Sequence, residues 1–519
     1  MKNKQNTFLT QLLKICICDR IGYSTIYIGR KKQFFAARDM ENLKEKTAKG
    51  LFWGAMSSGM TQVLNLVFGI FLARLLAPSE YGIVGVLTIF SAVAGAIQSG
   101  GFGAGLINIK RPTNNDYNSV FWLNISVSLT LYIMLFLCAP LIASFFKQPC
   151  LVLVSRVVFL SLPISAVALV SGTYLAKNMM NRELAIISVM ALVISGITGV
   201  SLAFMGFSYW SLVWQQLAYV IVSDIGRFYF APWRPSLHID FTPVKKMFSF
   251  CIKLTLTGII NTLNQNILTF VFGRLFTISS VGNYSQANKW NSMAYSTITS
   301  SIGQLAQTVF VAASDEDKRE IRVFRKMIRF TAFISFPALF GLAMVSREFI
   351  LITIGEKWID SILLLQLLCI GGAFMPLYTL YQNIAISHGR SDLYMWCNLG
   401  QIIIQLFMVL ILYQQGIVTI IYAYSVLTIL WLFVWQIIGH QLIGIRFIDM
   451  LKDTIPFAAI SVAVMVTTWY ATSFISNIYL LLVCRVLVAA GLYMLVMKML
   501  KVRIMDECIN FILKKKSNV

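Results

Sequence analysis

Two apolar stretches of the sequence carry polar residues at the spacing of one helix face. In residues 248–273 the polar positions are Lys253, Thr257, Asn261, Asn264 and the adjacent Gln265. In residues 281–311 they are Ser285, Lys289, Ser292, Ser296, Ser300 and Gln307, with Gly303 on the same face. Side chains three or four positions apart share one face of a helix. Each stretch therefore predicts a helix whose polar face lines a site or a contact with another helix.

Lys289 is the residue most suited to binding chemistry. It lies about 12 Å along its predicted helix, at about 1.5 Å per residue, which is too deep for its ammonium to reach a membrane surface easily. Lys253 lies near the end of its helix, where a lysine can extend to the surface instead. Intramembrane cations with almost no carboxylate around them attract anions such as a pyrophosphate.

A third stripe is uncharged and consists of Ser57, Thr61 and Asn65. Arg74 and Arg274 stand at the ends of two predicted helices. The alternative for each stripe is packing, because Ser and Thr also join helices in membranes. The candidate cavity residues are Lys289, Arg274, Arg74, Lys253, Asn261, Asn264, Gln265, Asn65, Ser292 and Ser296.

The chain around these stripes has the composition of a membrane protein. Of its 519 residues, 58% are hydrophobic and 12% are charged, and the mean hydropathy is +0.74. About fourteen apolar runs are long enough to span a bilayer, which takes roughly 20 residues each as a helix. Their approximate spans are 51–73, 82–107, 119–146, 151–176, 184–206, 208–231, 248–273, 281–311, 328–346, 359–386, 393–413, 416–440, 455–473 and 477–499. We therefore expect an all-α polytopic membrane protein.

The formal charge of +22 is arranged by topology rather than for nucleic acid. Lys and Arg cluster in alternate loops, as the positive-inside rule requires for two cytoplasmic termini. The exceptions on the outer side are Arg74, Lys147, Arg274, Arg347 and Lys357, and those within predicted helices are Arg156, Lys253, Lys289 and Arg485. The largest basic cluster is Lys318, Arg319, Arg322, Arg325, Lys326 and Arg329. No soluble domain with basic residues among aromatics is present, which argues against nucleic-acid binding.

Other chemistries find little support in the sequence. The nine Cys are scattered without a C-x-x-C motif and there are three His, which argues against a disulfide framework, a metal site or a cofactor. Asp224 is an acid inside a predicted helix, and we expect it to pair with Arg227. The run 100–105 is rich in glycine, but without a preceding strand it predicts a helix break or close packing, not a nucleotide loop.

The chain repeats itself at an offset of 200 residues. Arg74 matches Arg274, Ser79 matches Ser279 and Gly82 matches Gly282. Each half then has six helices and begins on the same side, which predicts parallel repeats as in transporters. The expected divisions are 1–49 (basic cytoplasmic segment), 50–231 (N-lobe), 232–247 (linker), 248–441 (C-lobe) and 442–519 (two further helices and a basic tail).

The motifs of the repeat resemble those of a known family. They are Lys49-Gly50-Leu51-Phe52-Trp53-Gly54, Leu72-Ala73-Arg74-Leu75-Leu76-Ala77-Pro78-Ser79-Glu80-Tyr81-Gly82, Gly101-Phe102-Gly103-Ala104-Gly105-Leu106-Ile107 and Gly282-Asn283-Tyr284-Ser285-Gln286-Ala287-Asn288-Lys289. Over about residues 40–500 the sequence resembles the Wzx-type polysaccharide flippases of the lipopolysaccharide biosynthesis branch. These belong to the MOP superfamily, together with the MATE exporters and the lipid II flippase.

The resemblance implies two six-helix lobes around a cavity that opens alternately to each side of the bacterial inner membrane. It implies an undecaprenyl-pyrophosphate-linked oligosaccharide as substrate, with Lys289 as the matching basic position, and membrane lipids and polysaccharide assembly proteins as partners. A MATE-like cation-coupled exporter is an alternative, although it would want carboxylates in the cavity. A membrane polymerase or glycosyltransferase is another, but Glu348 and Glu356 lack an evident partner on short outer loops. A scaffold without transport activity is a third.

The first residues of the chain give a separate prediction. Residues 1–39 are polar and basic, and Met40 begins the segment that leads into the first helix. We expect Met40 to be a true or alternative start, the other possibility being a real cytoplasmic extension. A chain that begins at Met40 should insert and restore polysaccharide export to a deletion strain as the full chain does. Loss of export on removal of residues 1–39 would contradict this.

Overall fold

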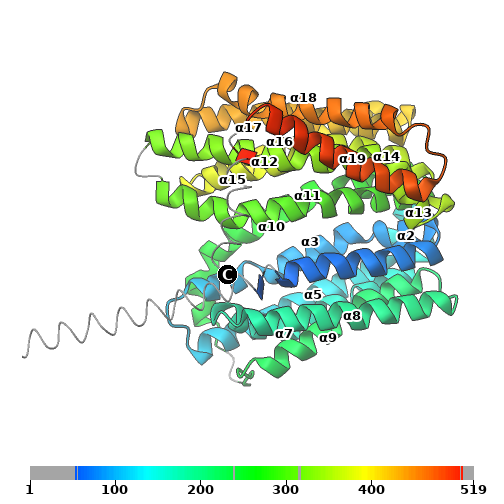
Figure 1. Cartoon of the computed structure of the whole chain (residues 1–519). Coiled ribbons are helices and arrows are strands. Elements are labelled where there is room, and N and C mark those ends of the chain that lie inside the picture. Colours follow the sequence, from blue (N-terminus) through cyan, green and yellow to red (C-terminus); the bar gives the residue numbers. More distant parts are fainter. Residues whose placement is uncertain (1–52, 55, 238–239, 314–316, 503, 506–519) are drawn as a thin grey trace, which may run out of the picture.

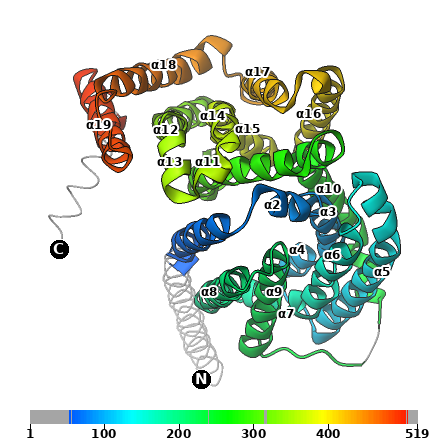
Figure 2. The same ribbon diagram turned by 90° about the vertical axis from the view of Figure 1, so that its right-hand side faces the viewer.

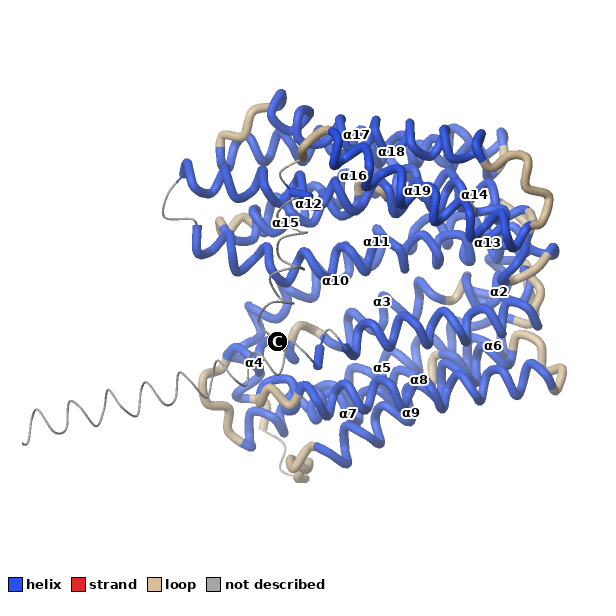
Figure 3. Tube along the Cα trace, viewed as in Figure 1, coloured by secondary structure: helices blue, strands red, loops and turns tan. Residues whose placement is uncertain are grey.

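The computed structural model describes residues 53–505 apart from 55, 238–239, 314–316 and 503. Residues 1–39 and Met40 therefore lie outside the described part. Within it, helices and the loops between them account for the whole structure (Figure 3). This follows from the composition, since a helix pairs its backbone polar groups within one segment, as lipid requires.

The helices form two groups that follow one another along the chain (Figure 1). The N-lobe contains the first helix, Met56–Leu75, followed by α2 (Pro78–Gly85), α3 (Thr88–Ser99), α4 (Phe102–Asn108), α5 (Asn114–Phe146), α6 (Leu151–Val158), α7 (Ser161–Lys177), α8 (Asn181–Phe204) and α9 (Trp210–Phe230). The C-lobe contains α10 (Thr242–Leu275), α11 (Ile278–Ala313), α12 (Asp317–Met344), α13 (Ser346–Thr353), the short η1 (Glu356–Trp358), α14 (Asp360–Gly372), α15 (Met375–Ser387), α16 (Ser391–Leu412), η2 (Tyr413–Gln415) and α17 (Ile417–Ile443). Then α18 (Phe447–Ala471) and α19 (Ile478–Met499) lie at the side of the C-lobe (Figure 2).

Eleven segments of the described chain are long and apolar enough to cross a membrane. The long helices α9, α10 and α11 fall short of that apolarity. At 1.5 Å per residue, each is nevertheless at least about 30 Å long, which is the thickness of a bilayer core. With these three, the described part of every run expected from the sequence is helical, although some runs are divided into two or three helices. This confirms the all-α polytopic fold. The lower apolarity of α10 and α11 comes from the polar stripes.

Two helices begin earlier than hydropathy alone predicts. The run 328–346 starts at Asp317 as α12, and the run 455–473 starts at Phe447 as α18. The extra turns carry charges that pair with one another: the Arg325 guanidinium lies 2.6 Å from Asp453 and 3.0 Å from Asp449. Part of the basic cluster therefore joins α18 to the C-lobe, a role beyond setting topology.

The glycine-rich run is both a helix break and a close packing site, as expected. Gly100 and Gly101 have φ values of +53° and +65°, and they separate α3 from α4. A Cβ on Gly101 would lie 2.8 Å from the Cys251 carbonyl oxygen of α10. The first half of α10 therefore packs on the N-lobe. Val244 and Met247 are buried in this contact, although they fall in the predicted linker 232–247.

The two lobes touch most closely at a pair of equivalent glycines. A Cβ on Gly82 would clash with the carbonyl oxygen of Ile278, and a Cβ on Gly282 would clash with that of Pro78. Pro78 and Ile278 are themselves 200 positions apart. The contact is thus symmetric under the sequence repeat, which places the pseudo-two-fold axis at the crossing of α2 and α11. Both α2 and α11 begin near this crossing. We call this side of the molecule the joined end.

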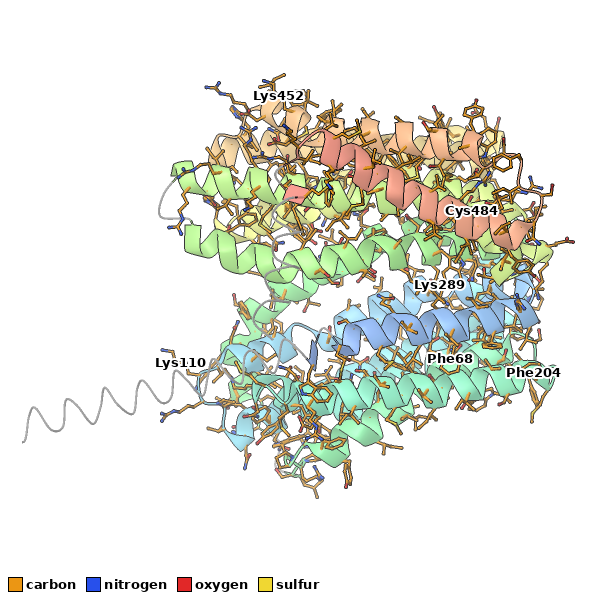
Figure 4. All side chains as sticks on the ribbon, in the orientation of Figure 1. Phe68, Lys110, Phe204, Lys289, Lys452 and Cys484 are labelled. Carbon is orange, nitrogen blue, oxygen red and sulfur yellow. The ribbon has the colours of Figure 1, made fainter. Side chains whose placement is uncertain are left out.

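The lobes separate toward the opposite side, which we call the open end (Figure 1). Met56 and Met60 of the first helix are exposed there, and a Cβ on Gly258 of α10 would meet no atom within 4 Å. Lys110 and Lys452 also lie at this open end (Figure 4). Since basic residues concentrate on the cytoplasmic side of membrane proteins, we expect the open end to face the cytoplasm.

Cysteine labelling in intact cells tests this orientation. In a chain without its nine native cysteines, Lys147→Cys should react with a membrane-impermeant maleimide from outside. Arg319→Cys, in the basic cluster, should react only after the cells are permeabilised. The reverse pattern would place the open end outside.

The glycine contact gives a second prediction. Gly82→Val and Gly282→Val should each force α2 and α11 apart, because both added side chains meet backbone of the other lobe. Spin labels at Lys147 and Gln414 should then be farther apart by double electron–electron resonance, and export per molecule should fall. Gly95→Val is the matched control, since a Cβ there would meet nothing within 4 Å. An unchanged label distance in Gly82→Val would show that the lobes are held elsewhere.

Candidate functional site

A pocket of about 590 Å³ lies between the lobes, beside the contact of Gly82 and Gly282. We call it the interlobe pocket. Its polar lining comes from the first helix, α2, α3, α8, α9, α10 and α11, and includes Thr61, Asn65, Tyr81, Thr88, Ser195, Gln215, Gln216, Tyr219, Asn266, Thr269, Ser285, Gln286, Asn288 and Lys289. The sequence prediction of a cavity between two lobes thus has a physical counterpart, with Asn65 and Lys289 on opposite walls.

Lys289 is the charged residue of this lining. Its side chain extends from α11 toward the first helix, so that a Cβ on Gly69 would lie 3.1 Å from Nζ (Figure 4). Within the described residues, its ammonium has no hydrogen bond and no ion pair. An unpaired cation in a membrane-depth pocket is expensive unless water or an anion solvates it, so this position is suited to an anionic ligand.

Neighbouring polar groups of α11 are also unpaired. Gln286 is 1% exposed, and neither its side-chain oxygen nor its nitrogen has a hydrogen-bond partner among the described residues. The same holds for the Ser285 hydroxyl, which would lie 3.0 Å from a Cβ on Gly85. Buried polar groups are usually hydrogen-bonded. These groups, one turn from Lys289, therefore add donors and acceptors to the same wall of the pocket.

A second pocket, of about 570 Å³, lies within the C-lobe and is called the C-lobe pocket. It shares Asn266 and Asn288 with the interlobe pocket. Its polar lining comes from α10, α11, α15, α16 and α17 and comprises Asn261, Asn264, Gln265, Asn266, Tyr284, Asn288, Ser292, Tyr295, Ser296, Thr299, Tyr378, Thr379, Gln382, Tyr394, Asn398, Gln401 and Tyr424. Asn261, Asn264 and Gln265 of the α10 stripe and Ser292 and Ser296 of the α11 stripe thus line this one pocket.

Part of the C-lobe pocket is held by an amide network between α10 and α16. Asn398 donates to Asn261 (2.6 Å), and Asn264 donates to Gln401 (3.2 Å). Gln405 also donates to Asn264 (3.4 Å). These hydrogen bonds hold α10 against α16. They agree in part with the alternative that polar stripes serve helix packing. The α16 partners were missed from the sequence, although amides three and four residues apart in an apolar run were a usable signal.

The two candidate arginines lie at the joined end and line neither pocket. Arg74 of the N-lobe donates to the carbonyl oxygens of Thr353 (2.6 Å) and Ile352 in the C-lobe. Arg274 of the C-lobe lies 5.3 Å above the ring of Phe145 in the N-lobe. Each arginine thus reaches across to the opposite lobe. Lys253 is exposed on α10 and also lines neither pocket.

Further contacts complete the joined end. Trp358 donates from Nε1 to the Ala73 carbonyl oxygen (2.8 Å), and its ring meets Tyr81 edge-on at 5.3 Å. Lys357 donates to the Arg74 carbonyl oxygen. Burial lowers the pKa of Lys357, while the Glu80 carboxylate opposes that shift. These contacts, several of them made by cations, join the two lobes at this end, and we call them the latch.

Several charged residues outside the pockets have partners of their own. Asp224 pairs with Arg227 at 3.5 Å, as predicted. Glu348 pairs with Arg485 of α19 at 2.8 Å, both side chains being buried. The expectation that Glu348 lacks a partner was therefore wrong, because only packing brings α13 and α19 together. Arg156 lies 4.3 Å above the Phe136 ring, a structural position.

The two pockets together offer one cation, many amides and hydroxyls, and several tyrosines. No acidic residue occurs in either described lining. Among the described residues, no cluster of His, Cys, Asp and Glu could hold a metal ion. The arrangement is suited to binding an anion attached to a hydroxyl-rich group rather than to acid–base chemistry.

Comparison with known proteins agrees with this geometry. The sequence profile of the family described as "Polysaccharide biosynthesis protein" matches residues 71–363. The lipopolysaccharide biosynthesis protein WzxC of Escherichia coli is 26% identical over 360 residues, 68% of this chain and 72% of that protein. The teichuronic acid biosynthesis protein TuaB of Bacillus subtilis is 25% identical over 375 residues, 70% of this chain and 76% of that protein.

Solved structures share the fold. The lipid II flippase MurJ in an inward closed conformation has a TM-score of 0.67 and 15% identity, over 89% of this chain and 99% of that chain. An inward-facing multidrug resistance MATE transporter of the MOP superfamily has a TM-score of 0.56 and 15% identity, over 73% of this chain and 94% of that chain. The chain thus shares the fold of these two proteins, and since the family profile covers more than half of the sequence, the chain belongs to the polysaccharide biosynthesis protein family.

Proposed function

We propose that this protein is a flippase that moves an undecaprenyl-pyrophosphate-linked oligosaccharide from the cytoplasmic to the outer leaflet for surface polysaccharide synthesis. The observation that carries the proposal is Lys289, an unpaired cation in an acid-free pocket between two lobes. Membership of the polysaccharide biosynthesis protein family supports a role in polysaccharide synthesis. The names of WzxC and TuaB, which are lipopolysaccharide and teichuronic acid biosynthesis proteins, support it.

Lys289 would hold the pyrophosphate, assisted by the free groups of Ser285 and Gln286. The polar faces of α10 and α11 would hydrate the sugars, which cannot enter hydrocarbon unaided. The polyprenyl tail would remain in lipid between the lobes. For each negative charge, outward movement from a negative cytoplasm is downhill by about 2.3 kcal/mol per 100 mV, so the membrane potential would favour this direction.

Alternating access would require the latch at the joined end to open while the open end closes. The Arg74 and Arg274 contacts would then be broken and remade in each cycle. This replaces the sequence-based proposal that both arginines bind substrate: they would act on the substrate only through the opening of its exit. Contacts with polysaccharide assembly proteins remain a prediction from the family.

The alternatives are less well supported. A cation-coupled exporter of the MATE type shares the fold, but the described pocket linings offer no carboxylate for the cation. A membrane polymerase would need an acid or base at a site. Of the two candidate acids, Glu348 is held in a buried ion pair with Arg485. Transport without catalysis therefore accounts best for the site.

Substitution of Lys289 tests the proposal. Lys289→Gln and Lys289→Ala should each lower polysaccharide export per inserted molecule at least about tenfold, since a hydrogen bond to a charged group contributes about 1.5–3 kcal/mol. Lys289→Arg should keep partial export, because the charge stays while the donor geometry changes. Surface polysaccharide divided by the amount of membrane protein is the measurement.

Lys253→Gln is the matched control, because this exposed lysine lies on the neighbouring polar helix but outside both pockets. It should export normally. Wild-type export per molecule in Lys289→Gln, together with a lower amount of protein, would show that Lys289 serves the fold and would refute the proposal.

A further inference from the structure

The C-lobe pocket differs from the interlobe pocket in having no charged residue in its described lining. Eight side-chain amides from α10, α11, α15 and α16 and five tyrosines line it, namely Asn261, Asn264, Gln265, Asn266, Asn288, Gln382, Asn398, Gln401, Tyr284, Tyr295, Tyr378, Tyr394 and Tyr424. Its volume of about 570 Å³ is within the usual range of small-molecule sites. The pocket therefore has the size and the donors of a binding site, but for a neutral ligand.

Some of these amides are held by the protein and others are free. Asn261 and Asn264 are bonded to amides of α16. Gln265 of α10, Asn288 of α11 and Gln382 of α15 have no side-chain hydrogen bond to another described residue. The Thr299 hydroxyl is buried without a partner. Free amides on three different helices surround one space.

An amide presents a carbonyl acceptor beside an NH₂ donor. Two neighbouring hydroxyls of a sugar can each donate and accept, so one free amide can bind both. The tyrosine rings add flat apolar surfaces with polar tips, which suit the two faces of a sugar ring. A carboxylate or ammonium on the sugar would find no counter-charge in the lining, and burying a charge without a partner is costly.

The pocket is also placed correctly relative to the pyrophosphate position. Asn288 lines both pockets and is adjacent to Lys289. From there Ser292, Ser296 and Thr299 follow along α11 and line the C-lobe pocket. At 5.4 Å per helical turn, they extend over about two to three turns. A pyrophosphate at Lys289 would therefore direct its first sugars into this pocket.

We infer that the C-lobe pocket is a subsite for uncharged sugars directly attached to the pyrophosphate, and that it selects substrates by this feature. The inference rests on the proposed function, since it needs the pyrophosphate at Lys289. Acidic or basic sugars of the same substrate would then lie farther along the oligosaccharide, outside the pocket. The neutral sugar would be hydrogen-bonded by the amides of Gln265, Asn288 and Gln382.

Binding measurements on the full chain in lipid nanodiscs test the inference. Three ligands are compared: undecaprenyl pyrophosphate without a sugar, with one glucose, and with one glucuronic acid. The glucosyl ligand should bind about tenfold tighter than the bare one, as expected for one or two net hydrogen bonds. The glucuronosyl ligand should bind no tighter than the bare one.

The variants separate the two parts of the site. Gln382→Leu and Gln265→Leu should each remove most of the gain from glucose while leaving the affinity for the bare ligand unchanged, which also shows that the protein is folded. Lys289→Gln should weaken all three ligands. Gln414→Leu is the control, because Gln414 is an exposed amide in η2 at the joined end. It should keep the full gain.

The inference is overturned if the glucuronosyl ligand binds tighter than the glucosyl one, or if both glutamine variants keep the gain from glucose. In either case, weaker binding of the bare ligand by Lys289→Gln would leave the proposed function standing. If the bare ligand binds Lys289→Gln as well as the wild type, the pyrophosphate assignment fails, and the inference fails with it.

Discussion

The backbone contact between Gly82 and Gly282 is the constraint on which the arrangement of the lobes depends. At this crossing a Cβ on either residue would clash with a carbonyl oxygen of the opposite helix. Lipid gives no hydrophobic force between helices, so close backbone approach through small residues is the main way to join them. The arginine and tryptophan contacts of the joined end are added around this point. The interlobe pocket lies beside this crossing, and residues of both α2 and α11 line it.

The position of α10 explains why the lobes stay connected while one side is open. Its first half packs on the N-lobe through Cys251 and Gly101, and its second half faces α16 through the amide network. Phe270, near its end, stacks on Phe145 of the N-lobe at 5.5 Å. The helix therefore belongs to both lobes along one side. The opposite side, between the first helix and α11, is where Lys289 faces Gly69.

The buried and half-buried basic residues differ in whether a carboxylate lies beside them. Arg325 pairs with Asp453, and Arg485 pairs with Glu348. These two ion pairs join α18 and α19 to the C-lobe. Removing one member of such a buried pair is costly, because the other charge stays behind. Lys289 lines the interlobe pocket without a partner among the described residues, and in the proposed function the pyrophosphate would take that place. Arg325 and Arg485 therefore belong to the structural framework, whereas Lys289 belongs to the candidate site.

The sequence by itself determined the membrane class, the helices and the repeat, because hydropathy and the 3.6-residue period are local properties. It also pointed to the polar faces of α10 and α11, which can be read along one helix, and part of them, including Lys289, lines the pockets, whereas Lys253 does not. It did not reveal that Arg74 and Arg274 form a latch, that Glu348 pairs with Arg485, or that Gln382 and Asn398 complete the C-lobe pocket. Those relations join residues on different helices, and only the packing of the lobes decides which side chains share a space.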